Sequence, residues 1–240
     1  MSQRLIRRMF RQVRDANIKY HLVESGDKIA VAMSGGKDSI VMLYFLDLLL
    51  KHTPLLFEIK PLYLDMGFGN DAAAIASFCR DIGYELIIQE SNVGKVVFEN
   101  KKSDNPCALC SHLRRGALCR LASAHDCNKL ALGHHMDDVV NTLFMSMLYE
   151  GRYHVFKPIT HLDRADLYAI RPLIYVEEKD IRALCTYLEI QPVKNLCPAD
   201  GLTKRAETGD IVNQIEKIHP GARRKFLASI ENVRSEDFWS

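Results

Sequence analysis

The stretch Ser34-Gly-Gly-Lys-Asp-Ser39 lies between two apolar segments, and its residue types suit the binding of phosphate groups. Gly35 and Gly36 have no Cβ, so the backbone N–H groups of this turn can approach an anion closely. A helix that begins near Asp38 would direct the positive end of its dipole at the same point, where Lys37 adds a full charge. An ordinary strand-to-helix turn is the alternative, but the run is more specific than an isolated glycine pair. We therefore predict a phosphate-binding loop.

The spacing differs from Gly-x-x-x-x-Gly-Lys-Ser/Thr, the loop of common kinases and GTPases. It resembles instead the pyrophosphate loop of the N-type ATP pyrophosphatases. That resemblance implies that ATP is split into AMP and pyrophosphate, and that the AMP activates a carbonyl oxygen. Asp38 would then help to hold Mg²⁺ on the pyrophosphate, because hard divalent cations prefer carboxylate and phosphate oxygens.

Cysteines form a second group with chemical potential. Cys107 and Cys110 are separated by two residues at the start of a predicted helix, where thiolates are favoured. Cys197 precedes a proline in a turn-rich segment and could fold back to this pair. A second Cys-x-x-Cys is missing from the sequence, which disfavours a zinc ribbon. Three thiolates around one centre suit an iron–sulfur cluster, while a zinc site, a redox triad and simple helix capping stay open. Three other cysteines lie in apolar helical patterns typical of small core residues, namely Cys79, Cys119 and Cys185. Cys127 lies in a polar turn before a predicted strand, and its role stays open, with a structural role favoured.

Polar side chains also follow two predicted strands, at the ends where open parallel sheets bind ligands. Asp65 ends one strand, although an aspartate in this position is often only a turn former. Gly133 and His134 end another, and Asp137 and Asp138 begin the helix that follows. We expect Asp65, Gly133, His134 and Asp137 to contact a nucleotide, and Asp138 to take part in catalysis. Helix capping is the alternative for the two aspartates, and plain hydrogen bonding is the alternative for the histidine.

Strands that alternate with helices predict an α/β fold that positions these groups. We expect a five-stranded parallel sheet with helices on both faces, and a polar loop over residues 150–166. The organisation that we predict is a basic N-terminal helix packed on the core (1–24), an ATP pyrophosphatase domain (25–206) and a helical tail (207–240). The predicted strands are 29–33, 59–65, 85–89, 129–133 and 167–174.

Composition sets broad limits on the class of protein. The 240 residues carry a net charge of +2, and 48% are hydrophobic and 26% charged, as in ordinary globular domains. The apolar runs fall short of the roughly 20 residues that cross a bilayer, and the N-terminus lacks an apolar secretory segment, so we expect a cytoplasmic protein without membrane contact. Six basic residues among the first twenty give the N-terminal helix either a solvated face or a surface for RNA.

Five motifs occur in an order that carries a more specific resemblance. They are Ser34–Ser39, Cys107–Cys110 with Arg114-Arg115-Gly116, Leu132–Asp138, Ile170–Leu173 and Asn195–Cys197. Over residues 3–235 the chain resembles the tRNA 2-thiocytidine synthetase (TtcA-type) family, which belongs to the PP-loop ATP pyrophosphatases. The resemblance implies that Cys107, Cys110 and Cys197 hold a [4Fe-4S] cluster. It also implies that ATP and Mg²⁺ are used to thiolate a cytidine in the anticodon loop of tRNA.

The reaction implied by this resemblance has two steps. The C2 oxygen of the base attacks the α-phosphate of ATP and releases pyrophosphate; a cluster-held sulfide then replaces the adenylated oxygen, and AMP leaves. Lys37 and the loop amides would offset the charge on the phosphates, while Arg115 or its neighbour Arg114 would hold the base or the α-phosphate. We also expect a homodimer and a sulfur donor such as a cysteine desulfurase. Two alternatives are an enzyme that thiolates another nucleoside or a small metabolite, and a non-catalytic cluster-bearing redox or RNA-binding protein.

Overall fold

A central β-sheet positions the predicted loop in the computed structural model, which describes residues 2–99, 106–190, 193, 196–197, 204–234 and 236. The strand order is β3-β2-β1-β4-β6-β5, and neighbouring strands are parallel except for the antiparallel pair β5 and β6. The strands are β1 (Lys28–Met33), β2 (Glu58–Asp65), β3 (Ile87–Glu90), β4 (Lys129–Ala131), β5 (Ile159–Leu162) and β6 (Leu167–Ile170).

The predicted α/β class is confirmed, and the sheet has one strand more than the five that we expected. Strand β5 lies in the stretch predicted as a polar loop, because its four residues, Ile-Thr-His-Leu, lack the apolar run typical of a buried strand. Among the described strands it pairs with β6 alone, in a hairpin at the edge of the sheet. Strand β6 ends at Ile170, earlier than predicted, because Pro172 has no N–H to donate to a neighbouring strand.

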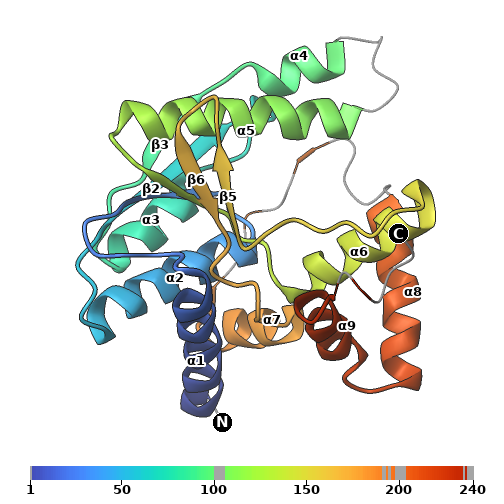
Figure 1. Ribbon diagram of the computed structural model, residues 1–240. Helices are drawn as coiled ribbons and strands as arrows, with labels where there is room; N and C mark the ends of the chain where they lie inside the picture. Colours follow the sequence, from blue (N-terminus) through green and yellow to red (C-terminus); the bar gives the residue numbers. More distant parts are fainter. Residues whose placement is uncertain are drawn as a thin grey trace.

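Helices cover both faces of the sheet (Figure 1). Two hydrophobic cores lie on the opposite faces of the sheet, and the side chains of β1 alternate between them. Ile29, Val31 and Met33 join the larger core, whereas Ala30 and Ala32 join the smaller one. The larger core also receives buried residues of α1, α2 and α7; the smaller one receives those of α5. The helices are α1 (Ser2–Tyr20), α2 (Lys37–His52), α3 (Ala73–Asp81), α4 (Val93–Glu99), α5 (Pro106–Ala124), α6 (Met136–Glu150), α7 (Glu178–Tyr187), α8 (Lys204–Ile218) and α9 (Ala222–Glu231).

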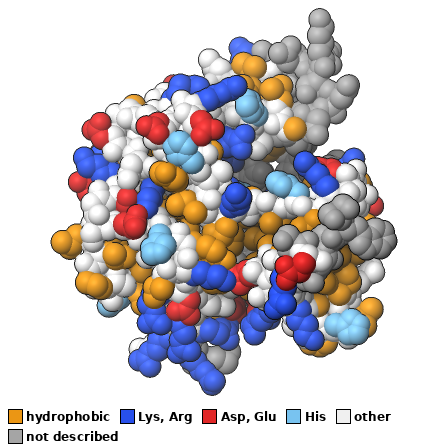
Figure 2. Space-filling view, in the orientation of Figure 1, with side chains coloured by type: hydrophobic (Ala, Val, Ile, Leu, Met, Phe, Trp, Pro, Cys, Tyr) orange, Lys and Arg blue, Asp and Glu red, His pale blue; other side chains and the backbone are white. Residues whose placement is uncertain are grey.

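Helix α1 packs on the domain through an apolar face, with Met9 and Val13 buried. It is tied to α7 by an ion pair between Arg8 and Asp180 at 2.7 Å. Its other arginines remain exposed, and Figure 2 shows lysine and arginine side chains gathered over this helix. At the other end of the chain, α8 and α9 pack against α6. Of the helices that the structure describes, none is long and apolar enough to cross a membrane.

Candidate active site

The predicted phosphate-binding loop joins β1 to α2, and a serine pair holds its shape. The backbone N–H of Ser34 donates to Oγ of Ser39 at 3.1 Å, and that hydroxyl donates to the carbonyl oxygen of Gly36 at 2.9 Å. Gly36 is the N-cap of α2 but offers no side chain to the first turn of the helix. Gly36 therefore supplies no side-chain cap to the first N–H groups of α2. A helix terminus that binds an anion needs these N–H groups for the anion.

Two glycines are required for steric reasons. Gly35 has a φ of +78°, and a Cβ at this position would lie 2.9 Å from Cδ1 of Ile75. Gly133 follows β4, and a Cβ there would lie 3.1 Å from the backbone carbon of Asp38 and 3.2 Å from the nitrogen of Ser39. The loop after β4 thus packs directly against the first turn of α2, which only glycine allows without displacement.

Lys37 is held by two carboxylates. Its Nζ lies 3.2 Å from Asp38 and 2.9 Å from Glu178, which is the first residue of α7. Burial alone would lower the pKa of Lys37, but the charges of Asp38 and Glu178 outweigh it and raise that pKa. Lys37 is therefore a full cation beside the loop, with Asp38 and Glu178 as its counterions.

Asp38 has a carboxylate oxygen suited to a cation. Its Oδ1 is buried and makes no hydrogen bond within the described structure; it lies 3.7 Å from Nε2 of His135. A buried carboxylate oxygen without a donor is costly unless a ligand satisfies it.

The two aspartates at the start of α6 have different surroundings. Oδ2 of Asp138 accepts a hydrogen bond from the N–H of His135 at 3.1 Å, which is the capping role anticipated as an alternative. Its Oδ1 lies 3.5 Å from Arg205, and the residue lines the cavity described below. Asp137 instead accepts from the N–H of Glu178 at 2.7 Å and lies 2.8 Å from Nε of Arg223, so it links α6 to α7 and α9. Burial would raise the pKa of Asp137, but its hydrogen bonds with His135 and Glu178 lower it.

His134 is a neutral side chain in the cavity wall. Burial lowers its pKa to about 4, and its ring lies against Phe156, with the ring centroids 4.9 Å apart. It is therefore uncharged near neutral pH and cannot serve as a cationic phosphate ligand there.

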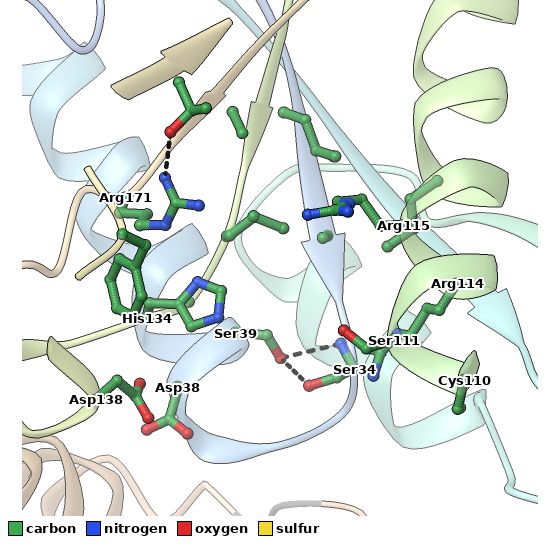
Figure 3. Close-up of a pocket in the computed structure, with 18 of the residues that line it drawn as sticks. Ser34, Asp38, Ser39, Cys110, Ser111, Arg114, Arg115, His134, Asp138 and Arg171 are labelled. Carbon is green, nitrogen blue, oxygen red and sulfur yellow. Dashed lines mark hydrogen bonds between the residues drawn. The ribbon is translucent and has the colours of Figure 1, made fainter. Parts of the chain in front are cut away.

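A cavity of about 780 Å³ extends from the loop across the α5 face of the sheet. Small strand residues, Ala32 and Ala169, form part of its floor. Ser34, Asp38 and Ser39 line one end, and Cys110 lines the same cavity (Figure 3). Cys197 is also among its lining residues. The volume is within the range of roughly 300 to 1,000 Å³ typical of ligand pockets. The side chain of Cys107 lies outside the described residues, although its backbone belongs to α5.

The cavity also carries four arginines, namely Arg114, Arg115, Arg171 and Arg205. Burial lowers the pKa of Arg114, while the nearby Cys110 acts in the opposite direction. Of these four, only Arg205 has a carboxylate within ion-pair distance in the described structure. The cavity is therefore rich in positive charge and suits an anionic ligand.

The structure brings most of the predicted residues together. The cavity contains Ser34, Asp38, Ser39, Cys110, Arg115, Gly133, His134, Asp138 and Cys197. Gly35, Gly36 and Lys37 belong to its loop. Asp137 points to α7 and α9, as described above. Asp65 accepts a hydrogen bond from the N–H of Gly67 at 2.8 Å, as a turn former does, and its contact with a nucleotide stays a prediction.

Four further residues were not predicted as site residues. Glu178, Arg205 and Arg223 reach the site from helices far along the chain, and their local sequence contains no recognisable pattern. Arg171 was missed because it lay inside the strand predicted over residues 167–174, whereas β6 ends at Ile170 and leaves Arg171 at the end where parallel sheets bind ligands.

A family model and curated relatives match nearly the whole of this chain. The family described as a PP-loop domain matches residues 3–206. A tRNA-cytidine(32) 2-sulfurtransferase of Geotalea uraniireducens is 34% identical over 238 residues, which cover 98% of this chain and 94% of the relative. The enzyme of the same name from Ralstonia pickettii is 35% identical over 235 residues, which cover 96% of this chain and 74% of the relative.

Two solved structures are similar to this chain. The U34-tRNA thiolase NcsA from Methanococcus maripaludis, solved with its [4Fe-4S] cluster, superposes with a TM-score of 0.79 and 28% identity, over 98% of this chain and 81% of that one. An NH₃-dependent NAD synthetase from Campylobacter jejuni has a TM-score of 0.52 and 15% identity, over 97% of this chain and 92% of that one, and shows the fold alone.

Proposed function

The chain belongs to the PP-loop family and, within it, to the tRNA-cytidine 2-sulfurtransferases, and from this premise we propose that it is an ATP-dependent tRNA sulfurtransferase. We propose that it adenylates the C2 oxygen of a cytidine in the anticodon loop, releases pyrophosphate and replaces that oxygen with sulfur. The observation that supports this most is the shared cavity, in which the pyrophosphate loop and two cysteines from distant segments face one space.

Magnesium fits the residues present. The buried Oδ1 of Asp38 has no hydrogen-bond donor among the described residues and lies at the end of the cavity next to the loop. We propose that this carboxylate holds Mg²⁺ on the pyrophosphate group of ATP, since Mg²⁺ prefers carboxylate and phosphate oxygens.

An iron–sulfur cluster also fits. Cys110 and Cys197 line the cavity, and Arg114 lies close enough to Cys110 for the thiolate to influence its pKa. NcsA, the structural relative at 28% identity, contains a [4Fe-4S] cluster. We propose that Cys107, Cys110 and Cys197 hold such a cluster here, leaving one iron without a protein thiolate. The cluster would supply a site that carries sulfide for the exchange.

The chain's own residues would bind and orient the reactants. Loop amides after Ser34 and the N-terminus of α2 would bind the β- and γ-phosphates. Lys37 would release its ion pair with Glu178 and bind a phosphate group instead. There it would offset the negative charge that develops as pyrophosphate leaves. Neutral His134 and the apolar floor would shield the reacting base from water, and Arg114 or Arg115 would hold the base or the α-phosphate.

Release of pyrophosphate from ATP labelled in its γ-phosphate tests this proposal. We expect release by the anaerobically purified protein to require added tRNA, and to continue past the first turnover only when sulfide is also present. A rate that is the same with and without tRNA would contradict the function, while a tRNA-dependent rate that is lost in Lys37→Met would support it. Lys217→Met, a change in the last turn of α8, is the matched control and should retain the rate.

Three further parts of the proposal derive from the resemblance. We propose a homodimer, which light scattering of the purified protein would test. We propose a cysteine desulfurase as the sulfur donor, which transfer of ³⁵S from labelled cysteine would test. The cytosol, where tRNA is abundant, is the compartment in which we propose that the enzyme acts.

A further inference from the structure

Arg171 is a buried cation with no carboxylate within ion-pair distance among the residues that the structure describes. The residue is only 8% exposed, and its Nε is buried without a hydrogen-bond partner in the described structure. Nη1 donates to the carbonyl oxygen of Lys157 at 2.6 Å and to Oγ1 of Thr160 at 3.3 Å, both neutral groups. The guanidinium also lies over the ring of Phe156, 4.9 Å from the centroid. Burying an unpaired charge is costly, and a bound anion would remove that cost.

A second arginine faces the same space. Arg115 projects from α5 on the opposite wall of the cavity, at the same end as Arg171 (Figure 3). Burial, together with the like charge of Arg115, lowers the pKa of Arg171 to about 10. The acidic residues of the cavity, Asp38 and Asp138, lie toward its other end, next to the loop (Figure 3).

The geometry points to an anion site formed by Arg171 and Arg115, which binds a phosphodiester group of the RNA beside the target nucleotide. This inference rests on the proposed function and adds the subsite that recognises the RNA backbone. A planar guanidinium matches the oxygens of a phosphate group, and two of them can clamp one phosphodiester.

The position of Arg171 favours the RNA over ATP as the source of that phosphate. Arg171 follows β6, and β4 lies between β6 and the strand that carries the loop, so the two backbones are about 10 Å apart. The guanidinium is turned toward Thr160 and away from the loop, where the pyrophosphate has its own binding groups (Figure 3). Leu118 and Leu162 also line this cavity and offer apolar surface to the face of a base.

Binding of an anticodon stem-loop RNA, measured by fluorescence anisotropy without turnover, tests the site. We expect Arg171→Gln to weaken binding about 10- to 100-fold, as loss of a charged hydrogen bond does. The slope of log K against log salt should fall by about 0.7, the value for one phosphate contact in single-stranded nucleic acid. Arg80→Gln, a change at an exposed residue of α3, should leave both quantities unchanged.

A neutral methylphosphonate linkage identifies the phosphate. Placed beside the target nucleotide, it should weaken binding by the parent and cause a smaller loss in Arg171→Gln, where Arg115 alone still contacts that phosphate. If Arg171→Gln fails to fold, Arg115→Gln replaces it, because Arg115 is exposed. If the variant binds RNA as tightly as the parent, the proposed site is wrong. It is also wrong if the variant loses affinity only for an ATP analogue. A parent that binds no tRNA would overturn the proposed function itself.

Discussion

Cys110 and Cys197 line one cavity although they come from opposite halves of the chain. The first lies on α5, and the second lies in the segment between α7 and α8. That cavity begins at the loop after β1, so the arrangement places thiol chemistry and nucleotide chemistry within reach of one substrate. This is the geometry that exchange of an activated oxygen for sulfur requires.

Cys197→Ser should remove most of the iron from anaerobically purified protein. The parent should contain about four irons per chain, as a [4Fe-4S] cluster does. Iron and sulfide counts with the visible spectrum give the readout. Cys119→Ser is the matched control, because burial in the smaller core raises the pKa of this thiol and makes it a poor ligand. A colourless parent that binds zinc, or a variant with full iron content, would contradict the assignment.

Glu178→Gln should strengthen the binding of inorganic pyrophosphate about two- to fivefold, since a partly exposed ion pair contributes up to roughly 1 kcal/mol. The reason is that Glu178 competes with phosphate for Lys37, from which it lies 2.9 Å away. Isothermal titration calorimetry gives the affinity. Arg182→Gln, which removes the exposed partner of Glu178 and leaves Lys37 in place, should change the pyrophosphate affinity less than twofold. Weaker binding in Glu178→Gln would show that the carboxylate positions Lys37 instead of blocking it.

Gly133→Ala should displace the first turn of α2 and weaken ATP binding at least tenfold. The added methyl group would lie 3.1 Å from the backbone of Asp38, and such overpacking typically costs about 1 to 3 kcal/mol. Thermal unfolding and ATP titration measure the two effects. Gly116→Ala makes the same change in α5, where the nearest atom is 3.7 Å away, and should stabilise the helix by about 0.5 to 1 kcal/mol. Unaltered ATP affinity in Gly133→Ala would refute this packing argument.

Replacement of His134 by asparagine should make the fold less sensitive to acid. Burial lowers the pKa of His134 to about 4, so the unfolded chain binds this proton more readily than the folded chain. The free energy of unfolding therefore decreases as the pH falls from about 6.5 to about 4, by up to about 3 kcal/mol for this residue. Urea titrations at several pH values should give a shallower slope in His134→Asn and an unchanged slope in the exposed control His219→Asn. An identical slope in His134→Asn would contradict the buried neutral histidine.

The local parts of this site could be predicted from sequence because each occupies one continuous stretch. Ser34 to Ser39 and Gly133 to Asp138 directly follow apolar strands, so their place at the end of the sheet follows from chain order. The contact between Lys37 and Glu178 could not be predicted, because it depends on how α7 packs beside α2. Strand β5 was missed for a related reason, since only its pairing with β6 makes those four residues a strand.

Mass spectrometry of nucleosides from the tRNA of a strain that lacks this gene tests the central claim most directly. We predict that 2-thiocytidine is absent from that tRNA, and that the parent gene restores it whereas the Lys37→Met and Cys197→Ser variants do not. Unchanged 2-thiocytidine in the deletion strain would contradict the account.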